Sequence, residues 1–416
     1  MGTRNSFIAH TIGLERQVPT IRQSARSESF LYANRYIAST AVGAIVFAPM
    51  AWHVVLDPVP GSDFSMHLGL ATRMWQEGAI GLPHFLYHFL ILLMSNCMGM
   101  TLKLASLLLT TAGLAAILPL SQLVIFRERG GLSALSIVLV TSIASSITIW
   151  TIPSHHLYFG YIPLAVYHSP TMTLMKPLAL WNFLLLSRGL TVRISSARVQ
   201  RWSVISLILC GLAKPSYVLI LLPAAIVFVC IRKLLRAEAS WWFLLHCVVV
   251  PSLALLIWQY CFTYLSNSAF YCERGETGIE FAPLLAVRTV SGNLLIKLLG
   301  SIAFPLSVSC VHWNRLRAYP EYNFALLLFS FGALCFYLLA ERGMHLTHLN
   351  FLWSASIGLL LWFLCCVRIL VVETRNSERE MGSMGTLICC FVLALHIICG
   401  ALWYAVEVTR SFAAGW

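Results

Sequence analysis

The sequence predicts an all-α fold, a polytopic transmembrane helical bundle, and three observations support this prediction. Of the 416 residues, 59% are hydrophobic and only 11% are charged, whereas a soluble domain of this length carries about twice that share of charge. The mean hydropathy is +0.79. Long apolar runs alternate with short basic stretches, as membrane spans alternate with cytoplasmic loops. We therefore expect a single transmembrane domain over residues 36–405, with about ten to eleven membrane helices.

The charge and the cysteines argue against several other classes of protein. The formal net charge is +12, and cytoplasmic loops rich in Lys and Arg are its ordinary source. Nucleic-acid binding would require a basic face on a soluble domain, which the sequence lacks, so we expect membrane lipids and no nucleic acid as partners. The 13 Cys residues stand mostly within apolar runs, without the CxxC spacing of a zinc site.

The first hundred residues predict a tail, one span and an outer loop. Residues 1–35 are polar and Arg-containing, so we expect a cytoplasmic tail before the first span, Tyr36–Leu56. Residues 57–98 are expected to form an outer loop. Within it, Asp63–Glu77 has helical spacing and an Asp suited to an N-cap, and we expect it to lie on the membrane surface. The apolar stretch His84–Met98 is too short to cross comfortably and is expected at the interface.

Further apolar runs complete the predicted bundle. The stretch Val204–Ile231 is long for one span and has basic clusters on both flanks, so we expect two short helices with a break at Lys214-Pro215, where Pro interrupts the helix ladder. The other predicted spans are Leu102–Phe126, Leu132–Ile152, Thr171–Leu186, Trp241–Phe262, Leu284–Val308, Phe324–Leu339, Phe351–Leu370 and Gly385–Tyr404.

The positions of Lys and Arg orient the predicted bundle. Of the 28 basic residues, 19 fall in segments assigned to the cytoplasmic side or its border. Because cytoplasmic loops carry the basic excess, we expect a cytoplasmic N-terminus and a short outer tail over residues 406–416, in a bacterial inner (plasma) membrane. Basic residues at the outer ends or within the membrane then require a reason, because charge at membrane depth is costly.

Polar residues from separate parts of the chain fall at the outer ends of these spans, and we expect them to line one water-accessible cavity. Asp57 and Asp63 are candidates to accept a proton from a hydroxyl, or to bind a divalent cation such as Mg²⁺ or Mn²⁺. Lys176, Lys214 and Arg342 are candidates to hold a phosphate or pyrophosphate. The candidates for substrate binding are His67, His84, His88, His168, Lys176, Lys214, Glu341, Arg342, His345, His348 and Asn350.

Each candidate also has a purely structural interpretation. Asp63 would then only cap a helix, and His84 would be an ordinary interfacial residue. Glu341 and Arg342 would pair with each other in an exposed loop. Lys214 is the hardest to explain in this way, because it lies in the middle of an apolar stretch at a helix break.

The order of these features resembles the integral-membrane glycosyltransferases of the GT-C fold. A first span is followed by the acid-bearing segment Asp57-Pro-Val-Pro-Gly-Ser-Asp63-Phe-Ser-Met-His67, then by a surface helix and by Pro83-His84-Phe85-Leu86-Tyr87-His88. The resemblance implies that Asp63 or Asp57 is the base that activates the acceptor. It also implies a polyprenyl-phosphate-linked sugar donor and a site that faces away from the cytoplasm. Many members have two adjacent acids in this loop, whereas here the two acids are six residues apart.

We therefore expect an enzyme that moves a sugar from a polyprenyl-phosphate-linked donor to an envelope glycan or lipid acceptor. Lys214, Lys176 and Arg342 would stabilise the departing phosphate. One alternative is a polysaccharide polymerase or ligase that uses a lipid-linked glycan and does not need the first-loop Asp. Another is a flippase or transporter, in which polar residues line a path through the midplane and internal repeats are expected.

Overall fold

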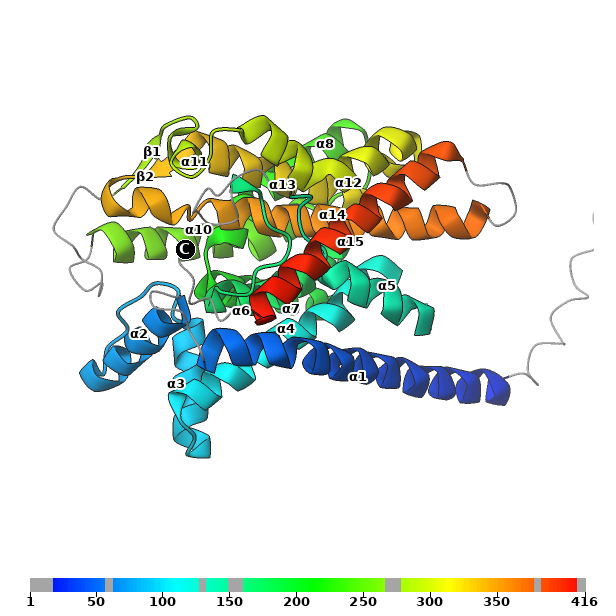
Figure 1. Cartoon of the computed structure of the whole chain (residues 1–416). Coiled ribbons are helices and arrows are strands. Elements are labelled where there is room, and N and C mark those ends of the chain that lie inside the picture. Colours follow the sequence, from blue (N-terminus) through cyan, green and yellow to red (C-terminus); the bar gives the residue numbers. More distant parts are fainter. Residues whose placement is uncertain are drawn as a thin grey trace, which may run out of the picture.

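The protein is a bundle of helices with one small sheet (Figure 1). The computed structural model describes residues 18–56, 63–126, 132–148, 160–265, 278–377 and 383–409. Strands β1 (Ile279–Phe281) and β2 (Leu339–Glu341) pair antiparallel, with Ile279 opposite Glu341. The predicted all-α class is confirmed, since this two-stranded ribbon is the only sheet in the described ranges.

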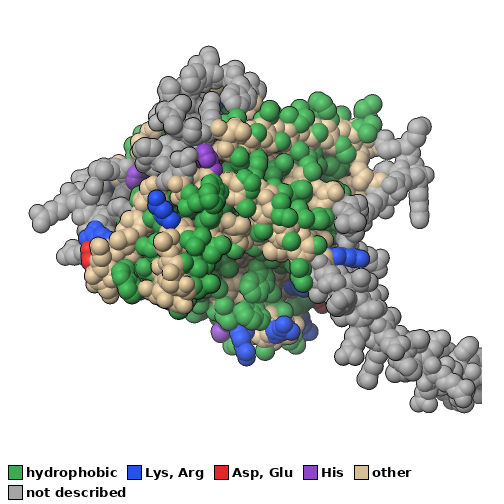
Figure 2. All heavy atoms as spheres, turned by 60° about the horizontal axis from the view of Figure 1, so that its bottom comes forward, with side chains coloured by type: hydrophobic (Ala, Val, Ile, Leu, Met, Phe, Trp, Pro, Cys, Tyr) green, Lys and Arg blue, Asp and Glu red, His purple; other side chains and the backbone are tan. Residues whose placement is uncertain are grey.

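Eight described helices are long and apolar enough to cross a membrane, so the chain is a multi-pass membrane protein. Ten to eleven membrane helices were expected, and eight of the described helices meet this length and composition. Figure 2 shows hydrophobic side chains over most of the described surface on one face, as lipid-facing helices require. The eight are α1 (Val18–Leu56), α4 (Leu102–Phe126), α8 (Ser216–Leu234), the segment Trp241–Leu265, α12 (Leu294–Leu316), α13 (Pro320–Leu338), α14 (Leu352–Ser377) and α15 (Met384–Thr409).

The other apolar segments are either too short or too polar to belong to this set. α5 (Leu132–Ser142), predicted as part of a span, has 11 residues, whereas a crossing needs about 20. α3 (Leu86–Met98) has 13 residues and is too short to cross, as expected for this stretch. α6 (Pro170–Thr191) and α7 (Ala197–Ala213) pack against each other inside the protein. The span Trp241–Leu265 consists of four consecutive helical elements, α9 (Trp241–Leu244), η2 (Leu245–Val249), α10 (Val250–Tyr260) and η3 (Cys261–Leu265). The remaining short elements are α2 (Asp63–Glu77), α11 (Leu285–Arg288) and η4 (Gly343–His348).

The buried polar groups of α6 are satisfied by its neighbours. Asn182 is fully buried, and its Nδ2 donates to the Ser203 backbone oxygen at 2.9 Å and to Ser206 Oγ at 2.8 Å on α7. The Tyr217 hydroxyl of α8 donates to Asn182 Oδ1 at 3.1 Å. Because buried polar groups are costly without partners, this network joins α6, α7 and α8 in a fixed arrangement.

Helices α13 and α14 form the best-packed pair, through close approach of their backbones. A Cβ atom at Gly332 would lie 2.6 Å from the Ser354 backbone oxygen, and one at Gly358 would lie 2.7 Å from Phe329 Cα. Small residues at such positions let helices approach closely in a membrane, where lipid tails compete with side-chain contacts. α14 is consequently enclosed by the rest of the bundle and forms its centre.

The predicted span Leu132–Ile152 is wrong beyond Ser142, where α5 ends. The backbone of residues 144–148 is non-helical, and its polar groups find remote partners. Ser145 N donates to the His396 backbone oxygen at 3.1 Å, Ile147 N donates to the Gly300 oxygen at 2.9 Å, and His396 Nδ1 donates to the Ser145 oxygen at 2.6 Å. Non-helical backbone at membrane depth is tolerated only where protein satisfies it in this way.

Other predicted boundaries differ less. Asp63–Glu77 and Leu102–Phe126 are confirmed as α2 and α4. The predicted first span, Tyr36–Leu56, is confirmed to within one residue as Arg35–Leu56, although α1 as a whole begins at Val18. The predicted span Leu284–Val308 starts too early, because the short helix α11 ends at Arg288 and α12 begins only at Leu294.

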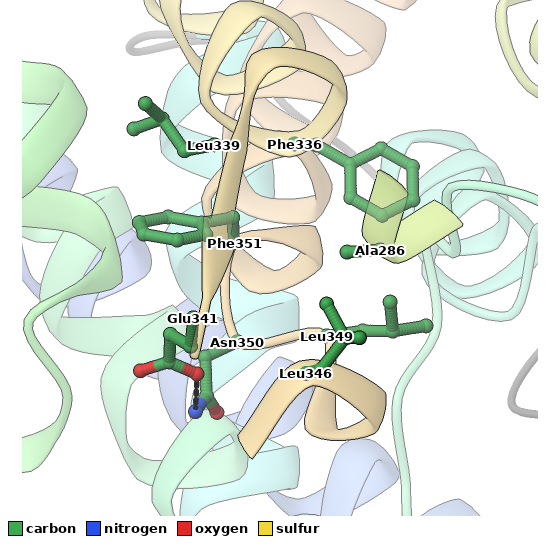
Figure 3. Close-up of a pocket in the computed structure, with 8 residues that line it drawn as sticks. All are labelled: Ala286, Phe336, Leu339, Glu341, Leu346, Leu349, Asn350 and Phe351. Carbon is green, nitrogen blue, oxygen red and sulfur yellow. Dashed lines mark hydrogen bonds between the residues drawn. The ribbon is translucent and has the colours of Figure 1, made fainter. Parts of the chain in front are cut away.

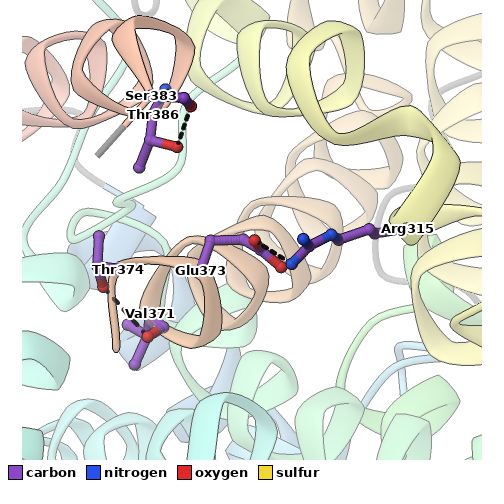
Figure 4. A network of polar contacts seen from close by, with 6 residues as sticks. All are labelled: Arg315, Val371, Glu373, Thr374, Ser383 and Thr386. Atoms are coloured by element: carbon purple, nitrogen blue, oxygen red, sulfur yellow. Dashed lines mark hydrogen bonds and ion pairs between the residues drawn. The ribbon is translucent and has the colours of Figure 1, made fainter. Parts of the chain in front are cut away.

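At the other end of α14 from Glu341, a carboxylate joins two helices (Figure 4). Arg315 of α12 forms an ion pair with Glu373 of α14. α12 bends just before this pair, at His312 (φ −112°, ψ 21°). Ser383 caps the start of α15 by accepting a hydrogen bond from Thr386 N at 3.3 Å.

Candidate functional site

Polar side chains from separate parts of the chain meet at one end of the bundle, which we call the site end and define by Asp63, Lys214 and Glu341. The three come from α2, from the break between α7 and α8, and from β2. Figure 1 places α2, α3, β1 and β2 at this end. The carboxylates of Asp63 and Glu341 both raise the pKa of Lys214, as acids near an ammonium do.

Lys214 occupies the predicted helix break, which is confirmed. α7 ends at Ala213, the Lys214 backbone is extended (φ −164°, ψ 133°), and Pro215 precedes α8. Lys214 Nζ donates to Thr171 Oγ1 at 3.3 Å and lies 5.0 Å from the ring centroid of Trp353. Burial lowers the pKa of Lys214 to about 8 against the opposing effect of the two carboxylates. Among the described side chains none forms an ion pair with this ammonium, so it remains available to an anion.

Asp63 is the first residue of α2, and its side chain is half-buried. The position suits a carboxylate, because backbone N–H groups and the helix dipole favour negative charge in the first turn. It is a helical residue, so the predicted N-cap position itself falls on residue 62, outside the described residues. The Asp63 carboxylate raises the pKa values of both Lys214 and His168. It therefore lies near two potential substrate-binding groups.

Three histidines line the α2–α3 side of the site. His67 and His88 are buried, and His67 Nδ1 lies 2.8 Å from His88 Nε2, so one ring donates to the other. Burial lowers the pKa of His67 well below its ordinary value, and His88, His84 and Lys214 add to this effect. Burial, with Lys214 and His88, lowers the pKa of His84 to about 3. All three rings are therefore neutral near pH 7 and act as hydrogen-bonding groups.

Acid should destabilise the protein through the His67–His88 pair. Burial lowers the pKa of His88 to about 4, so between pH 6.5 and 4 the unfolded chain binds more protons than the folded one. This contribution is complete above pH 6.5 and is lost as the pH falls, by about 2 kcal/mol at pH 5. We expect His88→Asn to reduce the acid-induced fall in Tm, measured by tryptophan fluorescence in detergent between pH 7.5 and 5. The exposed His348→Asn should leave that fall unchanged, and an equal fall in His88→Asn and wild type would contradict this assignment.

Gln259 of α10 fixes the segment that carries His84. Gln259 is buried, and its amide nitrogen Nε2 donates to the Pro83 backbone oxygen at 3.1 Å and to the Gly211 backbone oxygen at 2.7 Å. Pro83 directly precedes His84, and Gly211 lies in the last turn of α7 before Lys214. A single carboxamide thus ties the His84 segment to the helix end that presents Lys214.

His168 and Lys176 approach the site from the start of α6. The His168 ring lies 5.9 Å from the Trp353 ring, centroid to centroid. Burial lowers the pKa of His168, Asp63 opposes this effect, and Lys214 and Lys176 reinforce it. Lys176 is itself buried, with Nζ donating to the Leu164 backbone oxygen at 2.6 Å. Lys176 thus supports the Leu164 backbone, and burial lowers its pKa to about 7, whereas Lys214 is directed toward Thr171.

Glu341 and Arg342 do not pair with each other. Glu341 Oε2 accepts a hydrogen bond from Asn350 Nδ2 at 2.6 Å, and Oε1 accepts one from the Tyr264 hydroxyl at 3.4 Å. Arg342 Nε instead forms an ion pair with Glu280 at 2.9 Å, and its side chain is exposed. The structural interpretation of these two residues as a mutual ion pair is therefore wrong. Arg342 pairs with β1, whereas the Glu341 carboxylate contacts Asn350 and Tyr264.

A small, narrow pocket adjoins Glu341 (Figure 3). Glu341 and Asn350 point toward each other at one end, and apolar side chains form the rest of the wall. The pocket lies where the end of α13, the η4 turn and the start of α14 meet α11. The lining residues are Ala286, Phe336, Leu339, Glu341, Leu346, Leu349, Asn350 and Phe351.

Three other predicted site residues contribute nothing to this description of the site. Asp57 and the side chain of His345 lie outside the part of the chain that the structure describes. His348 is described and is exposed on η4. Among the side chains that the structure describes, no group of three or more His, Cys, Asp or Glu residues could hold a metal ion.

Several residues near the site were not among the candidates predicted from sequence. Thr171 and Trp353 contact Lys214, Tyr264 contacts Glu341, and Gln259 positions the His84 segment. Thr171 follows the Ser169-Pro170 turn that starts α6, which is a local signal. The other three lie within or beside apolar runs and gain their roles only from packing.

No family model and no curated protein sequence matches this chain. The site is consequently interpreted from its own chemistry. A half-buried carboxylate, an ammonium without an ion-pair partner among the described side chains, and neutral imidazoles meet at one end of a membrane bundle. Such a set can transfer a proton and bind an anion in the same place.

Proposed function

We propose that this protein is a membrane glycosyltransferase that moves a sugar from a polyprenyl-phosphate-linked donor to a glycan or lipid acceptor of the cell envelope. The observation that carries the proposal is the electrostatic interaction of two groups from separate parts of the chain, in which the Asp63 carboxylate raises the pKa of the Lys214 ammonium. A base and an anion-binding cation at one membrane end are the two groups that such a transfer needs.

In the proposed reaction, the Asp63 carboxylate accepts the proton of the acceptor hydroxyl. The acceptor oxygen forms a bond to the anomeric carbon as the bond from that carbon to the phosphate oxygen breaks. The electron pair of the broken bond stays on the prenyl phosphate, whose charge Lys214 stabilises. The ammonium meets the Thr171 hydroxyl and the Trp353 ring rather than a carboxylate, so the phosphate does not have to displace an ion-pair partner.

The contacts of the other two cations considered for phosphate binding support lesser roles for them in this proposal. Lys176 Nζ is held by the Leu164 backbone oxygen, and Arg342 is paired with Glu280 at the surface. Neither is needed for the proposed phosphate site. The neutral rings of His84 and His168 are suited to hydrogen-bond sugar hydroxyls, because a neutral imidazole offers one donor and one acceptor.

The proposal includes a setting and a family likeness. The site would face away from the cytoplasm in a bacterial inner membrane, because the loops rich in Lys and Arg are expected on the cytoplasmic side and the site residues follow the opposite ends of the helices. The chain would be similar to the GT-C enzymes in its first outer loop. A flippase would need polar groups along the midplane, whereas Asp63, Lys214 and Glu341 lie at the site end.

The direct test is transfer by the purified protein in lipid nanodiscs. Citronellyl phosphate esters of single sugars serve as donors, and a bacterial envelope lipid and glycan extract serves as the acceptor mixture. We expect acceptor-dependent release of citronellyl phosphate, detected by mass spectrometry. Donor movement between leaflets without cleavage would favour the flippase alternative, and neither cleavage nor movement with a folded protein would reject the proposal.

A further inference from the structure

The pocket beside Glu341 has the chemistry of a site for a small amide. Its walls are aliphatic and aromatic, and its polar end consists of one carboxylate and one carboxamide. Asn350 Nδ2 donates one N–H to Glu341 Oε2 at 2.6 Å. A carboxamide has a second N–H, and a carboxylate oxygen has further lone pairs. The pair therefore presents an acceptor and a donor side by side at the edge of an apolar space.

An acetamido group is complementary to this arrangement. Its N–H can donate to a Glu341 carboxylate oxygen, and its carbonyl oxygen can accept from the second N–H of Asn350. Its methyl group is apolar and small enough to enter a narrow space lined by Phe336 and Leu349. Apolar walls with a few directed polar groups at one end are the usual design of a small-molecule site.

The pocket is also next to the phosphate site, which restricts which acetamido group it would take. Asn350 donates to Glu341 at 2.6 Å, and three residues further along the chain the Trp353 ring lies 5.0 Å from Lys214 Nζ. In a sugar phosphate, C2 is bonded to the anomeric carbon that carries the phosphate. The substituent at C2 is therefore the sugar substituent that a pocket beside the phosphate-binding cation would meet first.

We propose that the pocket formed around Glu341, Asn350 and Ala286 binds the acetamido group of a 2-acetamido-2-deoxy sugar donor, which makes this protein selective for N-acetylated amino sugars. The inference rests on the proposed function, and it adds the class of sugar. Ala286 is the one small side chain in the lining, so a larger residue there would fill the space that the acetyl methyl enters.

The test compares the binding of two probes that differ only at C2, citronellyl phosphate esters of N-acetylglucosamine and of glucose. Affinities are measured by titration into nanodiscs that contain the full chain. A site built to hydrogen-bond a group discriminates strongly against a ligand that lacks it, and a methyl pocket adds about tenfold or more. We expect the wild type to bind the N-acetylglucosamine ester at least about 30-fold more tightly than the glucose ester.

Two variants locate this preference. Ala286→Leu should abolish it while leaving the affinity for the glucose ester unchanged, and Asn350→Leu should reduce it by removing the donor. Ala401→Leu, on the exposed face of α15, is the matched control and should retain it. Because Ala286→Leu is a core change, Asn350→Leu keeps the test decisive if that variant does not fold.

The outcomes separate the two proposals. Equal affinities for the two esters, both weakened by Lys214→Met, would overturn the acetamido assignment and leave the proposed function standing. An equal loss for both esters in Ala286→Leu would also overturn it, because the pocket would then contact the shared citronellyl chain. Failure of the wild type to bind either ester would reject the proposed function together with this inference.

Discussion

Asp63→Asn is expected to lower turnover by about 10²–10⁴-fold while leaving the affinity for the donor within about twofold of wild type. The amide keeps the shape of the side chain but cannot accept the proton of the acceptor hydroxyl. Asp63 is the described carboxylate that influences both Lys214 and His168, so no other described acid shares its position. The measurement is the initial rate of citronellyl phosphate release at saturating donor.

The matched control for this variant lies in the same helix. Glu77, at the end of α2, is exposed and pairs with Arg73 at 2.6 Å in the i, i+4 arrangement. Glu77→Gln should retain turnover within about twofold, since an exposed pair of this kind contributes only about 0.5 kcal/mol to stability. An Asp63→Asn protein with wild-type turnover would remove Asp63 from the mechanism.

Lys214→Met is expected to weaken donor binding and to lower turnover by about 10²–10³-fold at saturating donor. Methionine has a similar length and keeps contact with Trp353, but it offers no charge to the departing phosphate. Removing a partly buried ammonium should not destabilise the fold, because burial of that charge is itself unfavourable. The measurements are the affinity for the citronellyl ester, the rate of its cleavage and the Tm of the variant.

Arg342→Met provides the control for this second prediction. Arg342 is next to Glu341 in the sequence, but its guanidinium faces Glu280 at the surface. Its replacement should change donor affinity by no more than about twofold, as is usual for an exposed pair. A larger loss in Arg342→Met than in Lys214→Met would show that the phosphate binds on the β1 side of Glu341.

The sequence predicted those features whose causes are local. The helix Asp63–Glu77 follows from its own spacing and its leading acid, and the break at Lys214 follows from the adjacent Pro215. The end of α5 at Ser142 could not be predicted, because the non-helical backbone beyond it is stabilised by His396 and Gly300, far along the chain. Hydropathy alone extends a helix through such a segment.

The candidate site shows the same division. Lys214 was singled out because charge at a helix break in an apolar stretch is costly, and in the structure the Asp63 carboxylate raises the pKa of its ammonium. The partners of Lys176 and Arg342 are the Leu164 backbone and Glu280. Neither partner is implied by the local sequence, so these two residues could not be separated from Lys214 beforehand.

The central claim is that the site end brings the Asp63 carboxylate and the Lys214 ammonium to the same donor molecule. The most direct measurement is an experimental structure of the protein in nanodiscs with the bound citronellyl phosphate ester of N-acetylglucosamine. The predicted result is the phosphate within hydrogen-bond distance of Lys214 Nζ, with the anomeric carbon on the side of Asp63. A phosphate bound to Arg342, or near Arg315 at the far end of the bundle with Asp63 remote from the sugar, would contradict it.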